Sequence, residues 1–197
     1  MKKYFLFGTL SLMTALNAVS QKFPDMDQSP MDMSYYPVNY PILKIQDKVT
    51  EPPVARVIYS RPQKNGRVVF GGLNEYGKVW RMGANEATEI EFFQAVTVGG
   101  KPVPKGRYTL CTIPDTAKWT VILNTDTDTW GSFKYNSKKD LIRVDVPVQK
   151  SADPIEALGM YFSGTDDGFN LNAGWDNFTV SIPMKVVKKA TSTKAKK

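Results

Sequence analysis

The sequence predicts an all-β protein, a single β-sandwich or jelly-roll-like domain that follows a cleavable signal peptide. Short apolar runs with alternating polar residues recur along the chain, and Gly, Pro, Asn and Asp separate them. No stretch beyond the N-terminus has a convincing helical period. Roughly eight to ten strands at this close spacing are typical of sandwiches and jelly rolls.

The first 20 residues have the three parts of a secretory signal. Lys2 and Lys3 form a charged start, residues 4–16 are mostly apolar, and the small residues at 18–20 precede a cleavage site at Gln21. The apolar stretch is shorter than the about 20 residues that a membrane-spanning helix needs. We therefore expect cleavage, no transmembrane segment, and a protein exported to the bacterial periplasm or associated with the envelope.

The predicted division of the chain is a signal peptide (1–20), an extended N-terminal arm (21–41), a β-sandwich domain (42–184) and a Lys-rich flexible tail (185–197). The formal net charge of +7 comes from the two ends. Of 26 Lys and Arg residues, two lie in the signal peptide and six in the tail, which leaves 18 against 19 acidic residues. Nucleic acid is therefore not an expected partner.

The strands are predicted from alternation and turn residues. In the run 88–93, Ile90 and Phe92 face one way and Glu89 and Glu91 face the other. The other predicted runs are 42–49, 54–59, a hairpin that begins at 95–98 and turns at Gly99-Gly100, 107–113, 119–123, 141–148, 157–162 and 178–182. A helical turn is expected only at 156–158.

Several motifs carry a resemblance to a known family. They are Tyr-Ser-Arg-Pro at 59–62, Tyr-Gly-Lys-Val-Trp-Arg at 76–81, Gly-Ala-Asn-Glu-Ala-Thr at 83–88, Lys-Gly-Arg-Tyr-Thr-Leu at 105–110 and Trp-Thr-Val-Ile-Leu-Asn at 119–124. Over about residues 40–183 the chain resembles the uncharacterised bacterial family called domain of unknown function 2911. The resemblance implies an exported protein and brings no established activity. Cys111 departs from the family pattern, in which aromatic or aliphatic residues are common at this position.

The composition excludes several kinds of chemistry. The chain has no histidine and a single cysteine, Cys111, so Ser-His-Asp triads, Cys-His pairs and the usual zinc sites are absent. Cys111 lies in a strand-like run and is expected to be buried. The acidic loops near Asp126 and Asp166 supply too few side-chain oxygens for calcium. We predict no catalytic residue, no metal and no cofactor.

The candidate ligand site combines Arg81, Asn85 and Glu86, with Trp80 or Tyr76 as a stacking wall. These polar residues form a compact segment between apolar positions. The alternative is a structural latch, in which Arg81 pairs with Glu86 to fix a loop against the domain.

Loop aromatics offer a second place for a ligand. Trp130 lies in a loop with Tyr135 and is a candidate for stacking on sugar rings, although such aromatics are as often packed at an edge. A smaller hypothesis concerns Thr116, because Asp115-Thr116-Ala117 resembles a glycan attachment site on exported proteins. The alternative there is an ordinary turn.

Two functions follow as hypotheses. The first is a non-enzymatic binding or interaction module of the envelope, with a glycan or an envelope protein as its partner. The alternative is a carboxylate-dependent hydrolase that acts on a glycan, with Glu86 and Asp140 about 5 to 10 Å apart across one cleft. The sequence does not specify an oligomeric state.

Overall fold

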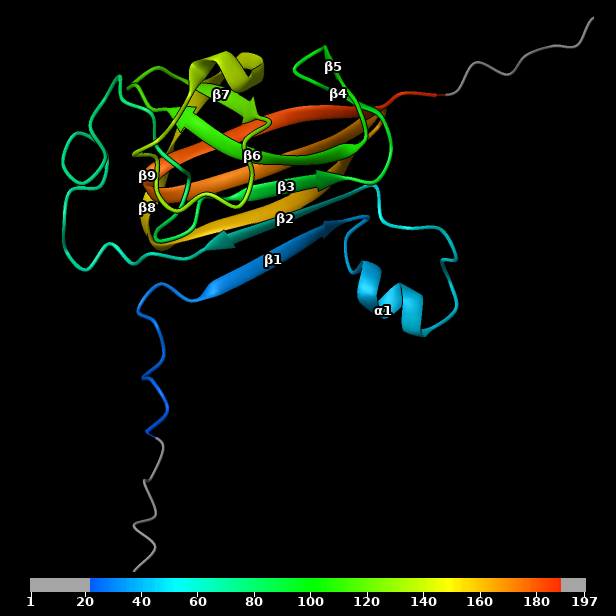
Figure 1. The fold of residues 1–197 in the computed structure, drawn as a ribbon, viewed down its shortest axis with the longest axis horizontal. Helices are drawn as coiled ribbons and strands as arrows, with labels where there is room; N and C mark the ends of the chain where they lie inside the picture. The colour runs from blue at the N-terminus through cyan, green and yellow to red at the C-terminus, as the bar shows by residue number, and fades with distance from the viewer. Residues whose placement is uncertain (1–21, 189–197) are drawn as a thin grey trace, which may run out of the picture.

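The structure, a computed structural model, describes residues 22–188. The predicted signal peptide and residues 189–197 of the predicted tail lie outside this range. The all-β prediction is confirmed, because the described chain forms one nine-stranded antiparallel sheet with almost no helix (Figure 1). No helix within residues 22–188 is long and apolar enough to cross a membrane.

The strand order is β1-β2-β3-β6-β7-β8-β9-β4-β5. The strands are β1 (Met31–Tyr36), β2 (Ala55–Ser60), β3 (Glu89–Phe92), β4 (Val96–Val98), β5 (Lys101–Val103), β6 (Gly106–Ile113), β7 (Lys118–Asn124), β8 (Asp140–Thr165) and β9 (Gly168–Val186). A helix α1 (Tyr40–Ile45) and a 3-10 turn (Ser137–Lys139) complete the elements.

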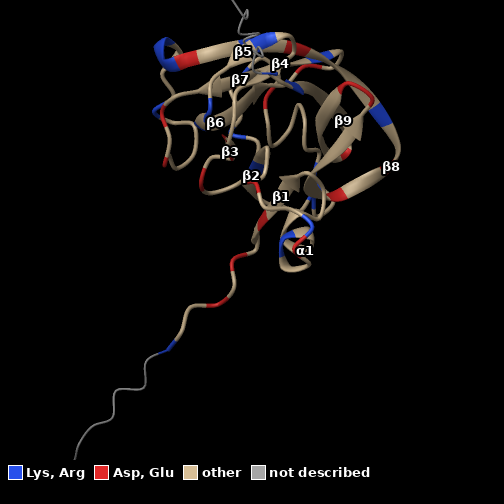
Figure 2. Cartoon of the chain, turned by 90° about the vertical axis from the view of Figure 1, so that its right-hand side faces the viewer, with Lys and Arg blue, Asp and Glu red and all other residues tan. Residues whose placement is uncertain are grey.

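The long strand β8 joins the two halves of the sheet. Its residues 140–147 pair with β7, and its residues from Val148 onward pair with β9. The sheet curves as a result, so that β1, β2, β3 and β6 lie on one side of the domain and β8 and β9 on the other (Figure 2). The alternating apolar side chains of both halves meet in one buried core.

An aromatic group dominates the core at the end of the domain that carries the long loops. Trp119 of β7 is fully buried, and its ring centroid lies 5.8 Å from that of Trp80 and 4.8 Å from that of Phe70. Trp175 of β9 stacks on Trp80 at 5.8 Å. Such pairs add about 0.5–1.5 kcal/mol beyond the area they bury. The loop residues Phe70 and Trp80 are therefore fixed against the sheet.

Two local predictions were wrong. The run 42–49, predicted as a strand, begins inside α1 and continues past its end. This helix has Pro41 in its first turn and no buried residue. A helix without a buried face leaves no apolar period in the sequence, so it could not be recognised there. The helical turn expected at 156–158 is instead part of β8. The arm expected at 21–41 supplies the edge strand β1, which pairs with β2 from Met31↔Ser60 onward.

The chain that follows β2 attaches the long loop to β8. The amide of Lys64 donates to the carbonyl of Glu156 at 2.7 Å, and the amide of Leu158 donates to the carbonyl of Pro62 at 3.0 Å. Gln63 and Ala157 form an antiparallel bridge. The loop 61–88 thus starts at a fixed position on the sheet.

Candidate ligand-binding site

The loop that follows β7 carries Trp130 and is attached to the segment around Glu86. Glu86 and Trp130 form an antiparallel bridge. On either side of it, the amide of Gly131 donates to Asn85 at 2.8 Å and the amide of Ala87 donates to the Thr129 carbonyl at 2.9 Å. Two segments that sequence analysis singled out separately, 85–86 and Trp130, therefore lie side by side.

Two exposed aromatic rings stand on this loop. Trp130 is 62% exposed and Phe133 is 83% exposed, and their ring centroids are 5.9 Å apart with an interplanar angle of 18°. Gly131 between them has φ +69°, and a Cβ added there would lie 2.7 Å from the Phe133 ring. Glycine is required because it accepts the left-handed backbone and leaves room for the ring.

A cavity of about 460 Å³ opens beside these rings. Thr109, Cys111 and Asn124 from β6 and β7 contribute to its lining, together with Trp130 and Phe133. Burial raises the pKa of the Cys111 thiol to about 12, with a smaller contribution from the charge of Asp140. The thiol therefore stays protonated at neutral pH and is not a nucleophile.

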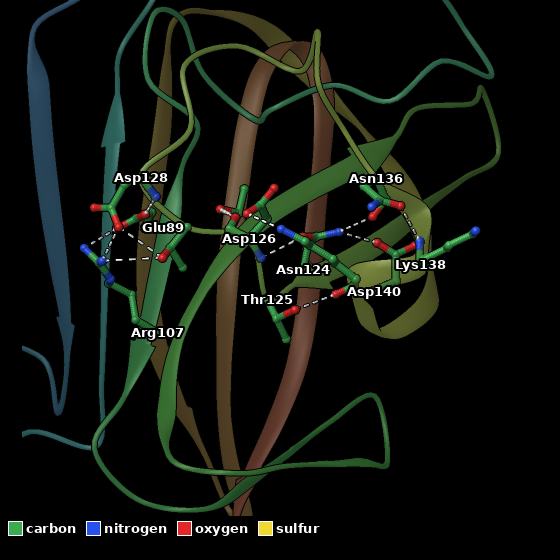
Figure 3. Close-up of polar contacts among 12 residues, drawn as sticks. Glu89, Arg107, Asn124, Thr125, Asp126, Asp128, Asn136, Lys138 and Asp140 are labelled. Carbon is green, nitrogen blue, oxygen red and sulfur yellow. Dashed lines mark hydrogen bonds and ion pairs between the residues drawn. The ribbon is translucent and has the colours of Figure 1, made fainter.

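Asp140 holds the inner end of this loop in place (Figure 3). Its side chain is 8% exposed and accepts hydrogen bonds from Asn124 Nδ2 at 2.7 Å, Tyr135 Oη at 2.6 Å and Arg143 Nε at 2.8 Å. Burial, together with the hydrogen bond and charge of Asp140, raises the pKa of the Tyr135 phenol to about 12. Asp140 positions the side chains that line the cavity, and its oxygens are occupied.

A second cavity of about 420 Å³ also borders Trp130 and is lined by Glu86, Glu89 and Asp128 among others. Arg107 neutralises two of these carboxylates, because its guanidinium lies 3.2 Å from Glu89 and 2.5 Å from Asp128. The amide of Asp128 also donates to Glu89 at 2.7 Å (Figure 3). Glu86 is exposed and takes no part in this network.

The predicted pair of Arg81 and Glu86 is not formed. None of the ion pairs made within residues 22–188 includes Arg81, and its guanidinium lines a different cavity from the one that Glu86 lines. The backbone between these two residues is left-handed at Met82 and Asn85, with φ 53° and 56°, and therefore changes direction there. The latch hypothesis, as an Arg81–Glu86 contact, was therefore wrong.

The predicted stacking wall is also not assembled. Trp80 is 4% exposed and its indole nitrogen donates to the Gly83 carbonyl at 3.2 Å, so its ring faces the core. Tyr76 is 38% exposed and packs over Gly71, and it is not among the residues that line the two cavities beside Trp130. Asn85 donates to Asp27 of the arm at 3.1 Å.

Two acidic residues of the loop that carries Trp130 are paired with cations. Asp126 pairs with Lys139 at 2.7 Å, and Asp128 pairs with Arg107. Over residues 22–188, no group of three or more His, Cys, Asp or Glu side chains is arranged to hold a metal ion. The chemistry that this arrangement offers is stacking and hydrogen bonding.

Sequence analysis missed Phe133 and Asn124. Phe133 is three residues after Trp130 in a loop that also holds Gly131, and this clustering of aromatics around a glycine was the available signal. Asn124 directly follows the predicted strand 119–123, and nothing in the sequence indicates that it is 2% exposed with its amide bound to Asp140.

The fold and the site together define a small all-β domain with an aromatic-walled cavity at one end of its sheet. A family model described as "Protein of unknown function (DUF2911)" matches residues 41–184, and the chain belongs to that family. A comparison with curated proteins and a comparison with solved structures gave no match.

Proposed function

We propose that this protein is a non-enzymatic binding module of the bacterial envelope, and that it takes a glycan at the cavity beside Trp130. One observation carries the proposal. Trp130 and Phe133 are large, exposed and stacked, and they border a cavity of about 460 Å³. Cavities of about 300–1,000 Å³ that combine aromatic walls with a few polar groups are typical small-ligand sites.

The polar lining suits a sugar. Asp126, Asp128 and Asn136 border the same cavity as the two rings. Carboxylate and amide oxygens accept hydrogen bonds from hydroxyl groups, while aromatic faces pack against apolar sugar faces. A ligand that presents both kinds of surface, as a pyranose does, matches this lining better than a purely apolar one.

Export is part of the proposal. The N-terminal charged, apolar and small-residue sequence supports cleavage before Gln21 and delivery to the periplasm or envelope. We further propose that the curved sheet forms a jelly-roll-like β-sandwich, because β8 pairs with strands of both halves of the sheet and one core fills the space between the halves. An envelope protein is the alternative partner for the same exposed rings.

The test is thermal unfolding of the purified protein against a panel of glycans. A ligand at 100 times its Kd stabilises by about 2.7 kcal/mol, which corresponds to roughly 5–10 °C in Tm for a chain of this size. Trp130→Ala and Phe133→Ala are expected to remove the shift. Tyr161→Ala is the matched control, because Tyr161 is 60% exposed on β8 and does not line the cavity. A shift that survives Trp130→Ala contradicts the site.

A hydrolase is the second candidate, and the carboxylates of the neighbouring cavity favour it. Glu86, Glu89 and Asp128 border one space beside Trp130. Asp140, the predicted partner of Glu86, does not line that cavity, so Glu89 or Asp128 takes its place in this hypothesis. Release of reducing sugar by the wild type, abolished by Glu86→Gln with glycan binding retained, would establish the hydrolase; binding without release supports the binding module.

A further inference from the structure

A third cavity, of about 310 Å³, lies on the loop side of the domain and has a different character from those beside Trp130. Arg67, Asn74 and Arg81 border it, and Trp175 of β9 supplies an apolar wall. No Asp or Glu is among the residues that line it. Two arginines and an amide thus face a space with no carboxylate.

Among the residues that the structure describes, Arg81 has no ion-pair partner. Its Nε is buried without a hydrogen bond, and the ion pairs within residues 22–188 do not include its guanidinium. Burial lowers the pKa of Arg81, and no neighbouring carboxylate offsets this effect. A partly buried cation without a counter-charge is costly, so it is an uncommon arrangement unless a ligand supplies the charge.

The backbone around Arg81 is fixed. The amide of Trp80 donates to Thr112 at 2.7 Å, and the amide of Thr88 donates to the Arg81 carbonyl at 3.1 Å. The next turn is fixed by Ser60, whose hydroxyl accepts from the amide of Ala84 at 2.7 Å. The guanidinium is therefore presented from a rigid support, which lowers the entropic cost of binding a ligand.

The second arginine is also free of carboxylates. Arg67 donates from Nε to the carbonyl of Lys64 at 2.9 Å and from its terminal nitrogen to the carbonyl of Gln63 at 2.6 Å. These bonds orient the guanidinium without neutralising it. The amide nitrogen of Asn74 is buried and has no partner among the described residues.

Three acidic residues that contact the segments around this cavity are engaged elsewhere. Asp176 pairs with Lys64 at 2.9 Å, and Glu156 accepts from the amide of Asn65 at 2.7 Å. Asp27 of the arm accepts from Asn85 at 3.1 Å and from the amide of Ser29 at 2.6 Å. None of these three carboxylates lines the cavity.

We propose that this cavity binds an oxyanion, the phosphate or carboxylate group of a small ligand, through the guanidinium of Arg81 with Arg67 and the Asn74 amide completing the donor set. A guanidinium presents two parallel donors that match the two oxygens of such a group. The site is separate from the cavity beside Trp130 and does not rest on the glycan proposal.

The test is thermal unfolding of the purified protein in phosphate, sulfate and acetate, each against chloride at equal ionic strength. At 100 times its Kd the bound anion is expected to raise Tm by roughly 5–10 °C. A response to phosphate and sulfate assigns a tetrahedral oxyanion, and a response to acetate assigns a carboxylate. Arg81→Met is expected to abolish the shift, and Arg81→Lys, which keeps the charge but loses the paired donors, is expected to weaken it.

Arg56→Met is the matched control, because Arg56 is a partly buried arginine that pairs with Glu91 at 2.6 Å and does not line the cavity. Its anion response is expected to equal that of the wild type. In buffer without oxyanions, Arg81→Met is expected to melt no lower than the wild type, since it removes an unpaired charge. A large drop in Tm would identify Arg81 as a structural anchor and overturn the proposal. An anion shift that survives Arg81→Met, or no shift at all in the wild type, would also overturn it.

Discussion

Replacing Asp140 by alanine is the sharpest test of how the loop that carries Trp130 is held. The substitution removes the acceptor of Asn124, Tyr135 and Arg143 together. These three donors come from the end of β7, from the loop and from β8. The loop is therefore expected to lose its attachment to the sheet at one point.

The three hydrogen bonds differ in the free energy that their loss costs. Asn124 is 2% exposed, and its Nδ2 keeps the Asn136 carbonyl at 3.0 Å as one acceptor, but its second buried N–H loses Asp140, which costs about 1–3 kcal/mol. Tyr135 is partly buried, and loss of its hydrogen bond costs about 1 kcal/mol. Arg143 is 43% exposed, can turn to water, and contributes about 0–1 kcal/mol. We expect a total loss of about 2–5 kcal/mol, or about 4–20 °C in Tm.

The assay is denaturant and thermal unfolding of Asp140→Ala beside Asp145→Ala. Asp145 lies on the same strand and pairs with the exposed Lys118. Its removal is expected to cost little, and that small loss is expected to shrink further in high salt. Adding Tyr135→Phe to Asp140→Ala is expected to cost less than Tyr135→Phe alone, because the shared hydrogen bond is already lost. Equal losses for Asp140→Ala and Asp145→Ala would refute this reasoning.

Three further predictions concern the same region. Gly131→Ala forces a left-handed backbone on alanine and places its Cβ 2.7 Å from the Phe133 ring. We expect the free energy of unfolding to fall by about 1–2 kcal/mol and glycan binding to be weaker than in the wild type. Unchanged binding would show that the position of the Phe133 ring does not matter. The pKa of Tyr135 is raised to about 12 from the usual 10, so the Tyr135 phenol stays protonated to a higher pH in the folded state than in the unfolded state. Its contribution to stability is therefore fully present below pH 10 and is lost as pH rises through 12, and tyrosinate absorbance with Tyr135→Phe as control follows it. Cys111, buried and with a pKa raised to about 12, is expected to react with a thiol reagent only after unfolding, and rapid labelling of the native protein would contradict its place in the core.

The sheet strands were largely predictable because their side chains alternate between core and solvent. The predicted runs 88–93, 107–113 and 119–123 coincide with β3, β6 and β7 to within about a residue or two. The runs 141–148 and 157–162, predicted as two strands, belong to the single strand β8. They were separated because the register of β8 shifts near Lys150 and Ile155, and the alternation of side chains breaks there. Local periodicity does not show whether such a break ends a strand or only shifts its register.

The site was less predictable because long-range contacts build it. The sequence indicated Trp130 and the polar segment 81–86, but not that Asn85 and Glu86 pair with the Trp130 loop while Arg81 faces another cavity. Arg81 and Glu86 face different cavities because the backbone between them is left-handed at Met82 and Asn85. Non-glycine residues rarely adopt this conformation, so the sequence does not predict it. The core position of Trp80 likewise depends on rings of distant strands.

The position of β9 makes completion of the sheet depend on a segment distant in sequence from β4. It is the last strand within residues 22–188, yet it lies between β8 and β4 in the sheet, and Val186 pairs with Val96. The sheet cannot be completed until β9 is available to pair with both of these strands. A product truncated before β9 would leave two strand edges, those of β8 and β4, open to aggregation.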